Sequence, residues 1–255
     1  MTTKRPLKTK IQPIRFKRGG EIEETDPDIE QLDELLPKPV FRILFNGPSG
    51  IGKSEAAKFF LCQYYKKFFD EIHIFCPTIL SDRTLKDLVI EDEPEKSPIH
   101  PDNVYTTSEV SEIVPILNNL HDRLQENAIE SPFYKSLVIF DDLSGELAKN
   151  SAVTNLFTRG RKANICIFIM SNKYKTFNPT IRNNLTHLAI FKPSNSGIEV
   201  KSIIEEMSGG HSAKAIENMM QEVYRNEPRG FVFIDKRAAA DKMFRHGIDK
   251  YITPD

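Results

Sequence analysis

The segment at residues 47–54 constrains the fold more than any other part of the chain. Residues 40–45 before it are mostly apolar and predict a β-strand, and residues 54–69 after it have the apolar spacing of an amphipathic helix. The segment consists of Gly47, Pro48, Ser49, Gly50, Ile51, Gly52, Lys53 and Ser54, and it fits the pattern G-x-x-x-x-G-K-[ST] at every position. A strand, this loop and a helix in succession are typical of a site that wraps around phosphate groups. We therefore expect all eight residues to bind the phosphates of a nucleotide.

Two side chains of this loop carry the chemistry. The glycines let the backbone curl so that successive N–H groups point at one anion, and the dipole of the following helix adds to this attraction. Lys53 is expected to reach the β- and γ-phosphates, and the Ser54 hydroxyl is expected to bind Mg²⁺. The loop thus predicts that a nucleoside triphosphate and Mg²⁺ are the cofactors.

A second motif indicates what happens to that nucleotide. The apolar segment 136–140 predicts a buried strand, and it ends in two carboxylates, Asp141 and Asp142. One acid at this point binds Mg²⁺, usually through water, and a second can polarise the attacking water. In a small-molecule kinase the acceptor, not water, must occupy the in-line position, so the pair favours hydrolysis. We assign Asp141 to magnesium and Asp142 to water activation; the alternative is that Asp142 only caps the next segment.

A GTPase is the first alternative to an ATPase. The residues from Asp142 to Gly145 fit D-x-x-G, and Asn172 and Lys173 begin like the guanine-binding motif N-K-x-D. Lys175 stands where that motif has its aspartate. The aspartate accepts two hydrogen bonds from guanine, and a lysine accepts none. We therefore predict ATP as the substrate, with cleavage of its β–γ phosphoanhydride bond.

Two further features surround the next apolar strand, at residues 164–170. Asn172 follows it and could lie between the acidic pair and the γ-phosphate, although Asn is also common in simple turns. Arg159 and Arg161 precede the strand and suit an arginine finger that acts on a neighbouring subunit, or a DNA contact; a solvated basic turn is the alternative. Arg182 is a weaker candidate of the same kind.

The remaining segments predict the fold class. Strand-like segments at 71–76, 137–140, 164–170, 187–191 and 230–234 alternate with helical segments at 110–125, 146–160 and 198–224. This alternation predicts an α/β fold, with a mostly parallel sheet and helices on both faces. It places one P-loop ATPase domain at residues 37–255.

Residues 1–36 differ from this domain in charge. Seven Lys or Arg lie in residues 1–20, and eight acids lie in residues 21–35, each without the opposite charge. We expect a charge-segregated arm or linker there, either solvated or in contact with nucleic acid or a partner. The three cysteines lie in apolar runs and suit buried free thiols, and no apolar run approaches the roughly 18 residues of a membrane span. We therefore expect no membrane partner and a cytoplasmic location.

The order of these motifs resembles that of the viral genome-packaging ATPases of the FtsK–HerA superfamily, the poxvirus-type motors that giant viruses, virophages and polinton-like elements also carry. The resemblance covers residues 38–235. It rests on the phosphate loop, the strand ending in the acidic pair, the turn with Arg159 and Arg161, the strand ending at Asn172, and the segment 179–183 before another strand.

This resemblance implies a RecA/FtsK-like ASCE fold with the strand order 5-1-4-3-2. It also implies a ring-shaped homo-oligomer, expected to be a hexamer, with ATP at the subunit boundaries and double-stranded DNA in the pore. The expected activity is packaging of a viral genome, with capsid protein as a further partner and the host cytoplasm, viral factory or virion as its place. Asn172 stands where relatives usually have glutamine, and Lys162 where many have histidine.

Two other functions remain compatible with the motifs. One is a different P-loop machine, such as a DNA helicase or a replication ATPase. The other is a nucleotide-dependent switch that binds a partner and barely hydrolyses. The acidic pair favours the motors, and the D-x-x-G match favours the switch.

Overall fold

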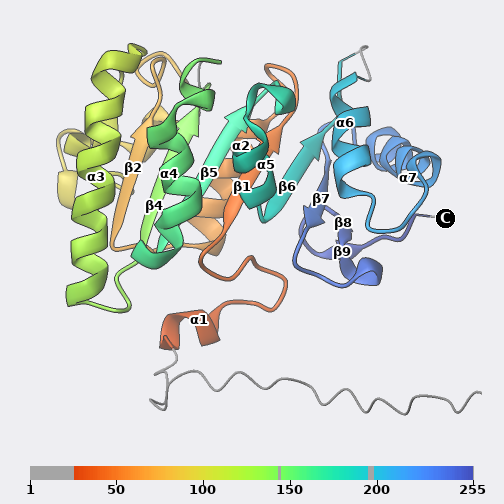
Figure 1. The fold of residues 1–255 in the computed structure, drawn as a ribbon, viewed down its shortest axis with the longest axis horizontal. Helices are drawn as coiled ribbons and strands as arrows, with labels where there is room; N and C mark the ends of the chain where they lie inside the picture. The colour runs from red at the N-terminus through yellow and green to blue at the C-terminus, as the bar shows by residue number, and fades with distance from the viewer. Residues whose placement is uncertain (1–25, 143–144, 195–197, 255) are drawn as a thin grey trace, which may run out of the picture.

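The computed structural model describes residues 26–142, 145–194 and 198–254, which contain a nine-stranded β-sheet with helices on both faces (Figure 1). The parallel strands are β1 (Arg42–Asn46), β2 (Glu71–Phe75), β3 (Val104–Tyr105), β4 (Ser136–Asp141), β5 (Ile165–Ser171) and β6 (His187–Phe191). The antiparallel strands are β7 (Phe231–Asp235), β8 (Phe244–His246) and β9 (Lys250–Tyr251). The predicted α/β class with a mostly parallel sheet is confirmed.

The strand order places the expected core at the centre of the sheet. The full order is β3-β2-β4-β5-β1-β6-β7-β8-β9. The five predicted parallel strands are β1, β2, β4, β5 and β6, and across the sheet they lie in the order β6-β1-β5-β4-β2. If these five strands are renumbered 1 to 5 along the chain, this order is 5-1-4-3-2. β3 extends one edge of this core, and the antiparallel unit β7–β9 extends the other. Of these four added strands, the sequence predicted only β7.

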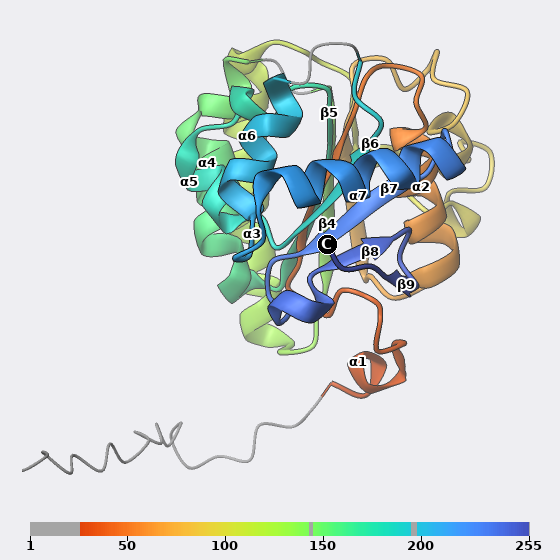
Figure 2. The same cartoon turned by 90° about the vertical axis from the view of Figure 1, so that its right-hand side faces the viewer.

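The helices form two layers, which Figure 2 shows on opposite sides of the sheet. α3 (Val110–Glu130), α4 (Ser151–Arg159), α5 (Pro179–Asn184), α6 (Ile198–Met207) and α7 (Ala213–Asn226) pack on one face. α2 (Lys53–Phe59) and the π-helical turn Phe60–Tyr64 pack on the other. Because both faces are covered, all seven residues of β5 are buried.

Two predicted helices differ from the structure. The helix expected at residues 54–69 is α-helical only to Phe59, continues as a π-helical turn, and is followed by Lys67 at a φ of 57°. The helix expected at 198–224 is two helices, α6 and α7. Gly209 and Gly210 separate them, with φ values of 58° and 94° that an α-helix cannot contain.

The described part of the predicted arm packs against the domain. Asp26 caps the short helix α1 (Pro27–Gln31), and Leu36 is buried. Lys135 Nζ lies 3.0 Å from Asp26 Oδ2 and 2.9 Å from Asp28 Oδ2, so two acids of this stretch are fixed beside the start of β4. The seven basic residues of the predicted arm lie outside the described residues.

Two smaller expectations concern cysteines and membranes. Cys76 and Cys166 are buried free thiols, as predicted, but Cys62 is only partly buried, because it lies at the exposed side of the π-helical turn. Within the described ranges, none of the helices combines the length and the apolar character that a bilayer crossing requires.

Candidate nucleotide-binding site

The predicted site residues meet at the carboxyl edge of the central strands. Asn46 of β1 is paired with Ser171 of β5, and Asp141 of β4 with Met170, so these three strands end together. A cavity of about 580 Å³ opens at this edge. The predicted residues that line it are Ser49, Gly50, Gly52, Lys53, Ser54, Asp141, Asp142 and Asn172. Three motifs that are far apart in the sequence therefore face one space.

The phosphate loop has the backbone that its glycines permit. Gly52 precedes α2 at a φ of 114°, a left-handed conformation that other residues rarely adopt. Gly47 passes so close to β6 that an added Cβ would lie 2.7 Å from Cβ of Phe191. A side chain at Gly47 would clash with β6, and a side chain at Gly52 would strain the backbone.

Lys53 lies across this loop. Its Nζ donates hydrogen bonds to the carbonyl oxygens of Gly47, at 2.9 Å, and Pro48, at 3.0 Å. Burial lowers the pKa of Lys53, and the carboxylates of Asp141 and Asp142 oppose that shift. The ammonium group is thus held on the loop, on the side of the acidic pair.

The acidic pair ends β4. Asp141 is partly buried, and its Oδ2 accepts a hydrogen bond from Cys76 Sγ at 3.5 Å. Burial raises the pKa of Asp141, and this hydrogen bond opposes the rise. Asp142 is exposed and has a φ of 54°, a conformation that Asp tolerates better than most residues. The two carboxylates therefore differ in burial.

The donor set of the cavity fits Mg²⁺. The Ser54 hydroxyl and the Asp141 carboxylate are oxygen ligands of the kind that this hard cation prefers, and both line the cavity. Among the residues that the structure describes, there is no cluster of three or more His, Cys, Asp or Glu that could hold a metal. Magnesium in such a site shares its ligands with nucleotide phosphates and water, so a complete protein cage is not required.

The strand before Asn172 is tied to the phosphate loop. The carbonyl oxygen of Ser171 accepts hydrogen bonds from the backbone N–H of Gly47, at 3.1 Å, and from Asn46 Nδ2, at 3.3 Å. Asn172 follows directly and is exposed toward the cavity. A movement of the phosphate loop would therefore change these hydrogen bonds at the end of β5.

The structure does not bring the two candidate arginines to this cavity. Arg159 is the last residue of α4, and Arg161 lies in the 3₁₀ turn that precedes β5; both are exposed. The length of β5, seven residues or roughly 23 Å, separates them from Asn172. Neither arginine therefore lines the nucleotide cavity of its own chain.

Arg182 has partners within the domain. Its guanidinium forms an ion pair with Glu206, with Nη2 3.0 Å from Oε1, and lies over the ring of Tyr174 at 5.5 Å. These contacts hold α5 against α6 and give Arg182 a structural role.

Apart from Met170 and Ser171 at the end of β5, the cavity is lined by five residues that sequence reasoning missed, which are Glu55, Thr78, Asp82, Thr84 and Arg229. The segment after β2 could have been found, since it follows a parallel strand and must lie at the same edge. Thr84 Oγ1 donates a hydrogen bond to Glu55 Oε1 at 2.8 Å, which joins this segment to α2. Arg229 could not be found in this way, because it precedes a strand rather than following one. It lies at the carboxyl edge only because β7 runs antiparallel to β6.

The segment that was compared with N-K-x-D is hydrogen-bonded to α6. The backbone N–H groups of Tyr174 and Lys175 donate to Glu199 Oε2, at 2.8 Å and 3.4 Å, and Lys175 does not line the cavity. Its side chain therefore does not decide between ATP and GTP.

Known structures share this fold. The genome packaging NTPase B204 from Sulfolobus turreted icosahedral virus 2, in complex with AMPPCP, is 14% identical, with a TM-score of 0.58 over 84% of this chain and 98% of that one. The DNA-packaging ATPase B204 from Sulfolobus Turreted Icosahedral Virus is 14% identical, with a TM-score of 0.56 over 84% of this chain and 98% of that one. The cytoplasmic domain of the type VII secretion ATPase EccC from Thermomonospora curvata is 11% identical, with a TM-score of 0.51 over 84% of this chain and 24% of that one. At these identities the likeness concerns the fold alone.

Sequence comparison identifies the family. No curated protein sequence matches the chain. The model of the family described as Poxvirus A32 protein matches residues 31–247, which is well over half of the chain. Together with the fold, this match confirms the resemblance to viral packaging ATPases of the FtsK–HerA type. The chain belongs to the Poxvirus A32 protein family.

Proposed function

We propose that the protein is an ATP-driven motor that translocates double-stranded DNA and packages a viral genome into its capsid. One observation carries this proposal: the phosphate loop, the acidic pair and Asn172 line one cavity, in a chain of the Poxvirus A32 family. The B204 proteins with the same fold are described as a DNA-packaging ATPase and a genome packaging NTPase.

The proposal gives each residue of the cavity a role that its position supports. The phosphate loop binds the triphosphate through its backbone N–H groups, and Lys53 moves from its carbonyl partners to the β- and γ-phosphates. Asp142 orients a water for in-line attack on the γ-phosphorus and accepts its proton. The bond to the bridging oxygen breaks, and ADP and phosphate leave. The Ser54 hydroxyl and the Asp141 carboxylate would hold Mg²⁺, which would supply positive charge beside the β- and γ-phosphates.

A ring explains why two exposed arginines lie far from their own cavity. In a closed homo-oligomer, such as the hexamer that we expect, one face of each subunit meets the opposite face of the next. Arg159 or Arg161 of one subunit then reaches the γ-phosphate bound by its neighbour. In this proposal Asn172, which lines the cavity, transmits the presence of that phosphate to β5 and the loop.

The experiment that tests this proposal compares ATP hydrolysis with and without double-stranded DNA. A motor is expected to hydrolyse ATP faster when DNA is present, because its cycle is coupled to movement along the duplex. Asp142→Asn serves as the control for contaminating ATPases. Hydrolysis that DNA leaves unchanged would favour the nucleotide-dependent switch and refute the motor. In this proposal capsid protein is a further partner. The protein acts in the host cytoplasm, the viral factory or the virion.

A further inference from the structure

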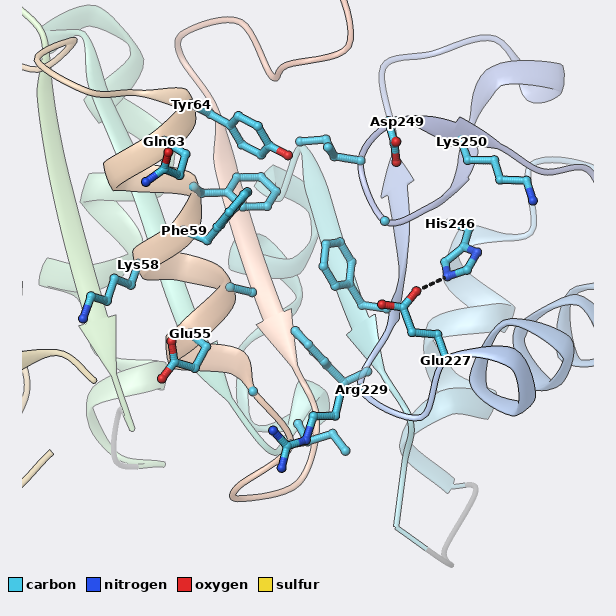
Figure 3. Close-up of a pocket in the computed structure, with 18 of the residues that line it drawn as sticks. Glu55, Lys58, Phe59, Gln63, Tyr64, Glu227, Arg229, His246, Asp249 and Lys250 are labelled. Carbon is cyan, nitrogen blue, oxygen red and sulfur yellow. Dashed lines mark hydrogen bonds and ion pairs between the residues drawn. The ribbon is translucent and has the colours of Figure 1, made fainter. Parts of the chain in front are cut away.

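A second cavity adjoins the phosphate cavity and is not explained by the phosphate loop. It has a volume of about 820 Å³ and lies between α2 with its π-helical turn on one side and the antiparallel unit β7–β9 on the other (Figure 3). We name it the aromatic cleft, after Phe59, Tyr64, Phe191 and Phe231 in its wall. Both cavities are lined by Gly52, Glu55 and Arg229, so they adjoin at these three residues.

The direction of the bound nucleotide points into this cleft. The groups that suit the γ-phosphate, Asp142 and Asn172, follow β4 and β5, which lie on one side of β1. The aromatic cleft lies on the other side, next to the end of β6 and the start of β7. A triphosphate on the phosphate loop with its γ end toward β4 therefore extends its nucleoside end toward the cleft.

The walls of the cleft suit a purine nucleoside. Phe59 is 52% exposed, although large apolar side chains are usually covered, and its ring centroid lies 5.1 Å from that of Tyr64. Aromatic faces of this kind stack on nucleic-acid bases. Polar groups lie opposite: His246 Nε2 and Glu227 Oε2 form a hydrogen bond of 2.8 Å, which joins the turn before β7 to β8. Carboxylates at such a rim can accept hydrogen bonds from ribose hydroxyls.

Arg229 stands where the two cavities join, and Figure 3 places it between α2 and the turn that carries Glu227. It is exposed, and within the described ranges its guanidinium has no hydrogen-bond or ion-pair partner. A guanidinium binds phosphate oxygens through two parallel hydrogen bonds. The junction is the place that the phosphate nearest the ribose would occupy.

We propose that the aromatic cleft binds the adenosine part of ATP, with Phe59 stacking on the base and Arg229 binding the α-phosphate in the same subunit. The proposal rests on the proposed function, because it assumes ATP on the phosphate loop. The proposal also gives a function to β7–β9, which lie outside the parallel core of the sheet. In this proposal β7–β9 close the nucleoside end of the ATP site.

The test compares two ligands by calorimetry in the presence of Mg²⁺. ADP contacts both cavities, whereas inorganic pyrophosphate fills only the phosphate cavity. Phe59→Ala is expected to weaken ADP binding roughly tenfold, within the range of a lost stacking contact, and to leave pyrophosphate binding unchanged. Arg229→Ala is expected to weaken ADP binding by a similar factor. Ile129→Ala, on exposed α3 surface, and Arg225→Ala, at the end of α7, are the matched controls and should behave as wild type.

The outcomes separate the two proposals. Retained pyrophosphate binding shows that Phe59→Ala is folded; because Arg229 lines both cavities, the fold of Arg229→Ala is checked by its circular dichroism spectrum instead. If both variants bind ADP as tightly as the controls do, the nucleoside does not lie in the cleft and the inference is wrong, while the phosphate site stands. If the wild type binds neither ADP nor pyrophosphate, the phosphate site fails, and the inference fails with it.

Discussion

The thiol of Cys76 lies 3.5 Å from Oδ2 of Asp141 and so links the end of β2 to the carboxylate that ends β4. Burial, followed by the nearby charge of Asp141, raises the pKa of Cys76 to about 12. The sulfur therefore keeps its proton and remains a donor. The carboxylate that we assign to magnesium is thus oriented by a group that does not itself face the nucleotide.

We predict that Cys76→Ala weakens the apparent affinity for Mg²⁺, because partners that orient a metal-binding carboxylate contribute to metal affinity. Such contacts are typically worth 10- to 100-fold, and for this weak donor we expect up to about tenfold. Cys76→Ser keeps a donor of similar size and should retain most of the affinity. The measurement is the Mg²⁺ dependence of ATP hydrolysis. Equal Mg²⁺ requirements for wild type and Cys76→Ala would contradict the orienting role.

The acidic pair leads to a second prediction. Asp142→Asn should bind Mg-ATP but hydrolyse it on the order of 10²–10⁴ times more slowly, because the amide keeps the shape and removes the base. Asp141→Asn should instead raise the Mg²⁺ concentration that binding requires. Fluorescent-nucleotide titration and single-turnover hydrolysis separate the two effects. An active Asp142→Asn, together with normal Mg²⁺ binding by Asp141→Asn, would reverse our assignment.

The position of Arg159 and Arg161 gives a third prediction. An arginine finger contributes on the order of 10³–10⁵ in kcat, so removing the correct arginine should nearly abolish hydrolysis. A mixture of that variant with Lys53→Ala should regain activity, since each supplies what the other lacks across a subunit boundary. Arg225→Ala, an exposed arginine on α7, is the control and should keep full activity alone. If no mixing ratio restores activity for either arginine, the finger acting across subunits is ruled out.

A fourth prediction concerns stability and pH. Glu71 is buried except for 11% of its side chain, and its carboxylate accepts hydrogen bonds from His73 Nε2, at 2.6 Å, and from Arg123. Burial raises its pKa, but these hydrogen bonds overcome that effect and lower the pKa of Glu71 to about 2. A lowered pKa contributes stability above the unfolded value of 4.5, and the contribution is lost as the pH falls from 4.5 toward about 2.

Glu71→Gln should therefore destabilise the protein at pH 7 by up to about 3 kcal/mol, given 1.36 kcal/mol per pKa unit. The difference from wild type should shrink as the pH falls below 4.5. Urea unfolding between pH 7 and pH 3 measures it. The control is Glu93→Gln, whose exposed pair with Lys96 should matter by less than about 1 kcal/mol. A difference that stays constant over this pH range would exclude the linkage.

The parallel core could be predicted because its signals are local. The phosphate loop specifies a strand, a turn and a helix at once, and the buried strand before Asp141 predicts where the acidic pair lies. Carboxyl ends of parallel strands meet at one edge, so Asn172 could be placed beside them without a structure.

The rest depends on contacts that the local pattern does not contain. The direction of β7 is set by its pairing with β6, and this pairing alone brings Arg229 to the cavity. The aromatic cleft likewise joins α2 to β8, which are almost 200 residues apart in the chain. The argument from Lys175 used a motif pattern alone, and such a pattern carries no information about which cavity the residue faces.

The central claim, ATP-driven movement along double-stranded DNA, is tested most directly by displacement of a third DNA strand. A triplex-forming oligonucleotide is annealed to one end of a duplex, and its release is followed after the protein and ATP are added. The account predicts release that requires hydrolysable ATP and is absent with Lys53→Ala, which lacks the charge aimed at the β- and γ-phosphates. ATP hydrolysis without any release of the third strand, at protein concentrations that saturate the duplex, would contradict the claim.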